Sequence, residues 1–415
     1  MRGTLHNHKI KYVCLAVLFF LFLIAGRSPA WAATQLGGTG AVLLDMQSGQ
    51  VLFEQAKDER LSPASTTKML TAIIAIESGK LEETVTIGPT PPKTEGTAVY
   101  LEEGERVKLR DLVQAALIFS ANDAAAAIAE YIAGTQSDFA VLMNQKAAEI
   151  GAQNSNFVNP HGLTAEGHYS TAYDLALLGR YAMQNETFKE IVQMKVYDWA
   201  GQAWQTRLIN KNEILWSYNG ATGVKTGYTK DAKNTIVASA ERGGRSYIAA
   251  VLGSSGTATW SDAQKLLDLG FDGFQQVKLA QPGEVMTTLS LDEETQLRLA
   301  PQQELVISLP VNEDVNKLQP KVSLKPLTGD IREGDHAGSI VYYLDDREVG
   351  ALELVYADTF IQPYNYLQTI LYGLAGLFCL QVLWRLYRLT ARKQRRNRGY
   401  SYGGGSSVYN MNREY

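Results

Sequence analysis

A serine and a lysine three residues apart, Ser65 and Lys68, are the residues of this chain best suited to chemistry. The surrounding sequence predicts a helix that begins at Ser62 and Pro63, because serine is a good N-cap and proline fits the first helical position. Residues three apart lie on one helix face, so the hydroxyl and the amine are within reach of each other. A lysine whose pKa is lowered by burial or nearby positive charge can take the proton of a serine nucleophile. A serine and a lysine at this spacing, without other motifs, are more often two solvated side chains, so further motifs decide the interpretation.

A second motif, Ser-Ala-Asn at 120–122, lies between two predicted helical stretches, 109–119 and 122–131. Serine and asparagine commonly cap a helix, and capping is the ordinary role that this position predicts for Ser120 and Asn122. Participation in a reactive site is the alternative, since a hydroxyl and an amide at a helix junction are also able to bind a substrate.

A third motif, Lys-Thr-Gly at 225–227, lies in a β-prone stretch, 223–229, with glycines on both sides. Glycine inside a strand suits a backbone that approaches a ligand closely. Another Ser-x-Asn occurs at 217–219, only a few residues before Lys225 and too near in the chain to face it across a cleft. The motif at 120–122 is therefore the one that we expect opposite Lys225.

The elements around these motifs predict an α+β domain over residues 33–272, with strands near both ends and helices between them. The expected strands are 40–45, 51–54, 223–229, 235–240 and 246–253. The expected helices are 62–78, 109–119, 122–131, 138–150, 171–181 and 259–269. A loop over 154–168 contains His161, which we expect to satisfy backbone groups within a turn and not to act as a base.

The remaining C-terminal part predicts a second domain and a membrane anchor. Residues 273–360 hold short alternating runs that are typical of a small all-β domain, without a catalytic constellation. Residues 366–387 are mostly apolar and precede a basic tail, which predicts a transmembrane helix with a cytoplasmic end. A helix lying on the membrane surface is the alternative, because Gln368 and Gln381 weaken the span. The tail at 388–415 is expected to be disordered.

The N-terminus predicts export. Basic residues precede an apolar run at 12–25, and Ala-Trp-Ala at 30–32 suits signal peptidase, so residues 1–32 are expected to be a signal peptide. An uncleaved N-terminal anchor is the alternative. Together with the C-terminal helix, this pattern predicts a protein body on the outer face of the cytoplasmic membrane.

Composition narrows the chemistry further. Among 415 residues there are two cysteines, Cys14 and Cys379, and both lie in hydrophobic segments. The exported body therefore has neither a thiol nucleophile nor a cysteine metal site. The five histidines show no zinc-ligand spacing, and we expect no metal and no cofactor. The net charge is -4 and the body has no basic run, which argues against nucleic acid as a partner.

In this order, and in an exported chain, the three motifs carry a signal that none carries alone. The chain resembles the low-molecular-mass penicillin-binding proteins, specifically the serine-type D-alanyl-D-alanine carboxypeptidases. The resemblance rests on Ser-Pro-Ala-Ser-Thr-Thr-Lys-Met, Phe-Ser-Ala-Asn-Asp-Ala, Gly-Val-Lys-Thr-Gly-Tyr-Thr, the Asn-Pro-His-Gly-Leu loop at 159–163, the β-rich domain and the anchor. It implies a penicillin-binding and β-lactamase-like transpeptidase fold, with an antiparallel sheet and a helical subdomain.

The activity that this resemblance implies is removal of the terminal D-alanine from peptidoglycan stem pentapeptides, with β-lactams as inhibitors. Ser65 would form the acyl-enzyme and Lys68 would be the base that activates it. Ser120 would relay a proton to the leaving D-alanine.

The resemblance also implies the residues that hold the substrate. Asn122 would bond the substrate backbone, and Lys225 would bind the terminal carboxylate and keep positive potential near the base. Thr226 and Gly227 would complete the substrate-binding strand. The backbone N–H groups of Ser65 and Tyr228 would form the oxyanion hole.

Two other functions remain open on the sequence. Class A β-lactamases share the three motifs, but they also need a carboxylate for deacylation, usually in Glu-x-x-Leu-Asn. That pattern is absent, and Glu166 lies in a different setting, Ala-Glu-Gly-His. A catalytically silent penicillin-sensing or wall-binding protein is the other alternative, and the presence of every reactive residue argues against it.

Overall fold

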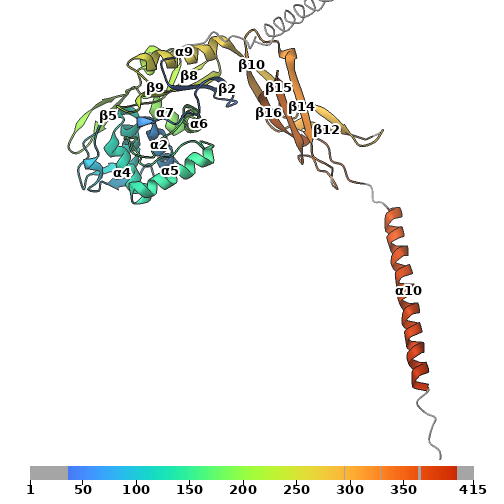
Figure 1. The fold of residues 1–415 in the computed structure, drawn as a ribbon. Coiled ribbons are helices and arrows are strands. Elements are labelled where there is room, and N and C mark those ends of the chain that lie inside the picture. Colours follow the sequence, from blue (N-terminus) through green and yellow to red (C-terminus); the bar gives the residue numbers. More distant parts are fainter. Residues whose placement is uncertain (1–35, 294, 328, 363–365, 400–415) are drawn as a thin grey trace, which may run out of the picture.

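Residues 36–293, 295–327, 329–362 and 366–399 are described by the computed structural model. The predicted signal peptide, 1–32, and the end of the predicted tail, 400–415, lie outside the described residues. Figure 1 shows two folded domains followed by a separate C-terminal helix, α10 (Tyr366–Gly399).

A five-stranded antiparallel sheet forms the centre of the first domain, and its strands come from both ends of that domain. The strand order is β2-β1-β9-β8-β7. The strands are β1 (Gly40–Asp45), β2 (Val51–Gln55), β7 (Ala221–Thr229), β8 (Lys233–Arg242) and β9 (Arg245–Ser254). The predicted strands are thus confirmed, and the one with Lys-Thr-Gly, β7, lies at an edge of the sheet as described.

Both faces of this sheet are covered (Figure 1). Successive residues of a strand point to opposite faces, and in β1 Val42 belongs to the core under the helical region while Leu43 belongs to the core under α9 (Ala258–Gly273). Helices α2 (Lys68–Glu77) and α6 (Ala172–Ala182) pack in the first of these cores. The sheet and α2 therefore share one rigid core, which fixes the Ser65 turn relative to β7.

Between β2 and β7 in the sequence, the chain forms α2, further helices and two small antiparallel strand pairs. The helices are α3 (Leu109–Gln114), α4 (Asn122–Ala133), α5 (Gln136–Ile150), α6, α7 (Glu186–Gln193) and α8 (Ile214–Ser217), with a π-helical turn over Ala115–Phe119. The antiparallel pairs are β3 (Thr84–Thr86) with β4 (Arg106–Lys108), which a long segment joins, and the hairpin of β5 (Val196–Ala200) with β6 (Gln205–Ile209). The β5–β6 hairpin is not evident from the sequence, since only Trp199 and Leu208 of its strands are buried.

The helix that carries Lys68 does not begin at Ser62, and that prediction is wrong. A 3₁₀ turn over Ala64–Thr67 comes first, and α2 begins at Lys68. Ala64 has a φ of +46°, and a Cβ placed on Gly162 would lie 1.9 Å from the Ala64 carbonyl oxygen. Close packing of the 159–163 loop against this turn thus overrides the local start signal.

The second domain is all β, as predicted. One sheet has the order β11-β12-β16-β15-β14, and β10 pairs with β13 in another. The strands are β10 (Phe274–Ala280), β11 (Thr287–Ser290), β12 (Gln296–Pro301), β13 (Leu305–Pro310), β14 (Leu318–Leu324), β15 (His336–Leu344) and β16 (Arg347–Tyr356). Their buried faces enclose a core of their own that includes Leu299, Ile307 and Leu354.

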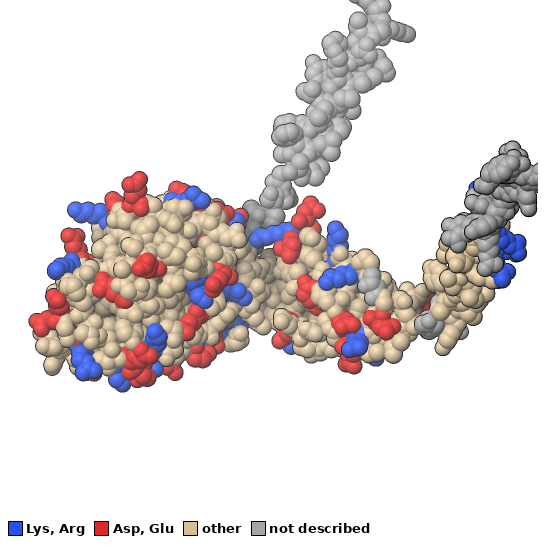
Figure 2. All heavy atoms as spheres, turned by 90° about the horizontal axis from the view of Figure 1, so that it is seen from below, with Lys and Arg blue, Asp and Glu red and all other residues tan. Residues whose placement is uncertain are grey.

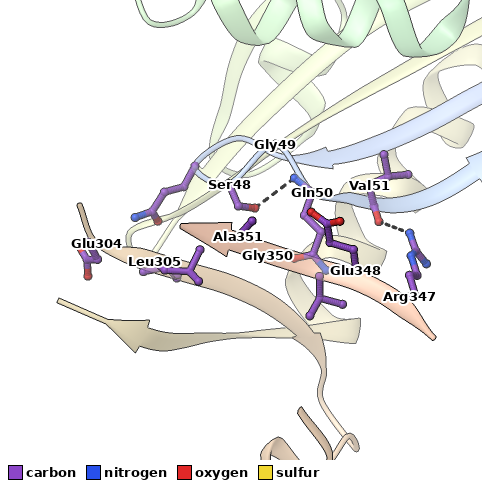
Figure 3. Close-up of a pocket in the computed structure, with 13 residues that line it drawn as sticks. Ser48, Gly49, Gln50, Val51, Glu304, Leu305, Arg347, Glu348, Gly350 and Ala351 are labelled. Atoms are coloured by element: carbon purple, nitrogen blue, oxygen red, sulfur yellow. Dashed lines mark hydrogen bonds between the residues drawn. The ribbon is translucent and has the colours of Figure 1, made fainter. Parts of the chain in front are cut away.

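Polar contacts join the β1–β2 turn to the second domain. Ser308 donates its hydroxyl to Asp45 at 2.6 Å, and the Gln50 amide both donates to and accepts from the Ser308 backbone at 2.9 Å. Arg347 donates to the Val51 carbonyl at 2.8 Å. A cavity of about 490 Å³ lies beside these contacts, between the turn and strands β13 and β16. Figure 3 shows the residues that line it.

Helix α10 exposes its apolar side chains instead of burying them, and Figure 2 shows it largely free of charge until blue basic residues gather at its far end. By length and composition, residues 366–393 of α10 suffice to cross a membrane. The helix continues to Gly399. The prediction of a disordered tail over 388–415 is therefore wrong for residues 388–399.

Candidate active site

Lys68 lies at the centre of a compact polar site. It is fully buried, and its ammonium group contacts Ser65 Oγ at 3.0 Å, Asn122 Oδ1 at 2.6 Å and the His161 carbonyl oxygen at 2.6 Å. The 3₁₀ turn brings Ser65 to Lys68, and the packing of α4 and of the 159–163 loop against α2 brings the other two oxygens. The structure thus joins three of the predicted site residues directly.

The hydrogen-bond pattern determines where the lone pair of a neutral Lys68 points. The Asn122 amide nitrogen donates to the Glu95 carbonyl at 2.6 Å, so its oxygen faces Lys68. This oxygen and the His161 carbonyl can only accept, and they take the two N–H bonds of the neutral amine. The lone pair is left facing Ser65 Oγ, which is the arrangement that a base for this hydroxyl requires.

The electrostatics of the site favour that neutral form. Burial lowers the pKa of Lys68 well below its usual range, and the positive charges of Lys225 and Lys211 lower it further, whereas Asp123 acts in the opposite direction. Burial also lowers the pKa of Lys225 to about 7, again with a contribution from Lys211. A buried amine surrounded by like charges is thereby able to take a proton near neutral pH.

Neither Ser120 nor Asn122 caps helix α4, so the capping interpretation is wrong for both. The N-cap of α4 is Ala121, without a side-chain bond, and the Asn122 side chain turns away from the helix to Lys68 and Glu95. Ser120 is buried and has a φ of +70°, a left-handed conformation that a non-glycine residue adopts at a cost. Such a strained residue beside a polar site is typical of functional positions.

Strand β7 lies against the Ser65 turn. A Cβ placed on Gly227 would lie 2.7 Å from the Ser65 backbone nitrogen, so only glycine leaves space at this N–H group. Lys225 is almost fully buried and donates to the Thr226 carbonyl at 2.9 Å. Tyr228 has an exposed side chain and follows Gly227 on the edge strand. A substrate that bonds to this edge would therefore lie next to Ser65.

Lys211 is a third lysine of the site that the sequence patterns do not single out. Its ammonium group donates to Thr97 Oγ1 at 3.2 Å and lies 4.7 Å from the centre of the Phe119 ring. Burial lowers its own pKa. No motif marks this lysine, because its place in the site depends on the packing of the β6–α8 connection against the 97–101 loop.

The 154–168 loop supports the Ser65 turn from the other side, and His161 takes part through its backbone oxygen, consistent with the structural role expected for it. His168 is also buried; its Nδ1 accepts the Val158 N–H at 3.1 Å, so its Nε2 carries the proton and donates to Thr67 Oγ1 at 3.0 Å. Burial and the Lys68 charge lower the pKa of His168 to about 4. Burial and the same charge lower the pKa of His161 to about 3, so both histidines stay neutral near pH 7.

Comparison with protein families agrees with this geometry. The family model described as D-alanyl-D-alanine carboxypeptidase, peptidase family S11, matches residues 28–256. The model described as penicillin-binding protein 5, C-terminal domain, matches residues 274–360.

Curated relatives and solved structures cover most of both domains. The chain is 32% identical to D-alanyl-D-alanine carboxypeptidase DacF of Bacillus subtilis, over 74% of this chain and 81% of that protein. It is 32% identical to DacC of Escherichia coli, over 81% of this chain and 88% of that protein. The crystal structure of penicillin-binding protein 5 from Haemophilus influenzae superposes with a TM-score of 0.71 and 28% identity, over 79% of this chain and 98% of that one.

The first family model covers the α+β domain that holds Ser65 and Lys68, the second covers the β domain that follows it, and the solved structure spans both. The chain belongs to the D-alanyl-D-alanine carboxypeptidase family and is a serine-type, penicillin-binding carboxypeptidase.

Proposed function

We propose that this carboxypeptidase removes the terminal D-alanine from peptidoglycan stem pentapeptides through an acyl-enzyme on Ser65. The observation that carries the proposal is the set of hydrogen-bond partners of Lys68: two of them only accept, which leaves the lone pair of the neutral amine to Ser65 Oγ. Ser65 Oγ attacks the carbonyl carbon of the penultimate D-alanine while its proton passes to Lys68. The peptide bond then breaks, and the leaving amine takes a proton through Ser120.

Water completes the cycle by hydrolysing the ester between the peptide and Ser65. In both steps negative charge develops on the carbonyl oxygen, and the N–H groups of Ser65 and Tyr228 are the proposed donors to it. The missing side chain of Gly227 supports this assignment, because it leaves the Ser65 N–H accessible. Asn122 and the β7 edge would hold the peptide backbone beside Ser65.

Lys225 is the proposed partner of the terminal carboxylate. A protonated lysine in a buried setting gives a strong charge-assisted hydrogen bond, and Thr226 and Gly227 continue the strand along which the substrate lies. Lys211 adds a second positive charge on the same side of the site. The pair suits a substrate that ends in a free carboxylate.

A β-lactam would acylate the same serine in this proposal and leave slowly. Class A β-lactamase activity needs a carboxylate that activates the deacylating water. Glu166, a glutamate of the nearby 154–168 loop, is exposed and lies in a turn. We therefore prefer the carboxypeptidase with β-lactams as inhibitors to a β-lactamase.

We further propose that residues 33–272 and 273–360 are two separate domains, held at the outer face of the cytoplasmic membrane by α10. Exposed apolar side chains along α10 support membrane insertion, since a long uncovered apolar helix is unfavourable in water. Basic residues at its C-terminal end support a cytoplasmic location of that end.

Release of D-alanine tests this function directly. The full chain in detergent micelles is incubated with a stem pentapeptide, and free D-alanine and the shortened tetrapeptide are quantified by mass spectrometry. We expect equal amounts of both products and none with Ser65→Ala. Cleavage at another bond, or release that persists in Ser65→Ala, would refute the proposal.

A further inference from the structure

The loop before helix α3, residues 95–101, wraps over the Ser-Ala-Asn motif. The Asn122 N–H donates to the Thr97 carbonyl at 2.7 Å, and the Asn122 side chain donates to the Glu95 carbonyl at 2.6 Å. A Cβ on Gly96, whose φ is +94°, would lie 2.6 Å from the Asn122 amide nitrogen. The loop is therefore fitted to Asn122 and forms part of the site wall.

Asp123, the residue after the motif, holds the far end of this loop. Its carboxylate is buried and accepts the backbone N–H groups of Val99 and Leu101, each at 3.1 Å, and of Ala124 at 2.9 Å. Both flanks of Tyr100 are thus bonded to one carboxylate. Burying a carboxylate costs free energy, and the hydrogen bonds described for this one come from backbone N–H groups. This arrangement indicates that Asp123, whose charge also acts on Lys68, serves to fix the backbone of the loop.

The feature that Asp123 fixes is the backbone of Tyr100. Tyr100 has a φ of +56°, a left-handed conformation, and its side chain is 62% exposed. The ring meets Trp204 edge to face, with centroids 5.2 Å apart, and Trp204 in turn lies 5.9 Å from Phe119, the residue before Ser120. An exposed aromatic ring whose backbone is fixed on both flanks, and which packs against Trp204, is preorganised to contact a ligand.

The aromatic cluster lies on the side of the site where the lysines gather. Lys211 contacts both Phe119 and Thr97, and its charge acts on Lys225, the proposed partner of the terminal carboxylate. A substrate whose terminal carboxylate binds Lys225 would therefore have its last residue, and not the stem that precedes it, on the side of Tyr100 and Trp204.

We propose that Tyr100, backed by Trp204, is a substrate-contacting residue that forms the wall beside the side chain of the terminal D-amino acid, and that Asp123 is a positioning residue for this wall. The inference rests on the proposed function and adds to it the basis of selectivity for the leaving residue. The methyl group of D-alanine fits beside the Tyr100 ring, whereas a larger side chain would clash with it.

A selectivity ratio tests the wall independently of general loss of activity. Two pentapeptides that differ only in their last residue, D-alanine or D-leucine, are given to the full chain in detergent, and kcat/KM is measured for each. We expect Tyr100→Ala to raise the D-leucine to D-alanine ratio about tenfold or more, because the wall is gone, and Tyr100→Phe to leave the ratio within about twofold. Trp216→Ala, which removes another exposed aromatic ring on α8, should not move it.

Asp123→Asn tests the positioning role, since the amide nitrogen of asparagine cannot accept from the loop. We expect the ratio to rise as in Tyr100→Ala, and the double variant to add nothing further. An equal loss on both substrates in Asp123→Asn would overturn the positioning role, and an unmoved ratio in Tyr100→Ala would overturn the wall. A wild type that releases neither residue would overturn the proposed function itself, and the inference with it.

Discussion

The Lys68 amine reaches three oxygen atoms, and of these only Ser65 Oγ carries a proton that it can give up. The same burial that lowers the pKa of Lys68 acts on Lys225, but the proposed mechanism needs the two lysines in opposite states. A general base must be neutral, and a partner for a carboxylate must be charged. The proposed mechanism therefore requires the pKa of Lys68 to lie below the pKa of Lys225.

The first prediction is a bell-shaped dependence of kcat/KM on pH. Activity should rise with pH as Lys68 loses its proton and becomes a base, and it should fall as Lys225, with a pKa of about 7 in the free enzyme, loses its charge. Steady-state kinetics from pH 5 to 10 measures both limbs. Lys225→Arg keeps its charge throughout this range, so its alkaline limb should move upward; an unchanged limb would show that another group causes it.

The second prediction tests whether Lys225 or Lys211 binds the terminal carboxylate. Amidation of the terminal D-alanine should lower kcat/KM of the wild type about ten- to a hundredfold, since a charge-assisted bond of about 1.5–3 kcal/mol is lost. Lys225→Ala should barely distinguish the acid from the amide. If Lys225→Ala still prefers the acid by the wild-type factor while Lys211→Ala does not, the carboxylate belongs to Lys211.

At the scale of elements, one turn and two loops surround Ser65, the proposed nucleophile. The 3₁₀ turn supplies Ser65, the 95–101 loop holds Asn122, and the 154–168 loop supports the turn through Gly162 and His168. Each loop is anchored by buried polar groups and not by a helix or sheet of its own. The geometry of the site consequently depends on these groups keeping their protonation states.

The third prediction concerns acid lability at His168. Its pKa is about 4 in the folded protein, below the value of 6.5 for a free histidine, so the unfolded chain binds the proton more tightly and stability falls as pH drops from 6.5 to 4. This group should cost about 2.5 kcal/mol between pH 7 and 4.5. Urea unfolding of His168→Asn, in which the amide oxygen can still accept from Val158, should show a correspondingly smaller loss on acidification. The full wild-type loss in that variant would assign the lability elsewhere.

Elements with a strong local signal were predictable from the sequence, and contacts between distant residues were not. The alternation and turn residues of 235–240 and 246–253 were enough to predict β8 and β9. Local rules alone predict a cap at Asn122, and only the resemblance implied a substrate-binding role; its side chain contacts Lys68, which lies 54 residues away in the chain. Lys211 carries no local signal at all.

For the whole molecule, the three motifs were informative only in combination and in order, because each alone is common. Together they carry the family resemblance that implies the chemistry of the site, while the start of the Ser65 turn depends on the 159–163 loop packing against it. The β domain was recognisable from its alternation. The polar contacts of Gln50 and Asp45 with Ser308 join residues more than 250 positions apart, and no pattern in the sequence indicates them.

The fourth prediction concerns the anchor. A chain that ends at Gln362 lacks α10 but keeps both folded domains, so it should be soluble without detergent and retain kcat/KM on the pentapeptide within about twofold. Fractionation of cells expressing each form, followed by the activity assay, measures both properties. Retention of the truncated form in the membrane fraction would show that another segment anchors the protein.

The acyl-enzyme on Ser65 is the central claim, and a covalent adduct tests it most directly. The full chain is treated with a penicillin, quenched, digested and analysed by tandem mass spectrometry, with Lys68→Ala as the matched variant. We expect the intact drug mass on Ser65, persisting because the Glu-x-x-Leu-Asn pattern that supplies a deacylating carboxylate is absent from the sequence, and an acylation rate at least about a hundredfold lower in Lys68→Ala. An adduct on any other residue, or rapid turnover of the drug without an adduct, would contradict the account.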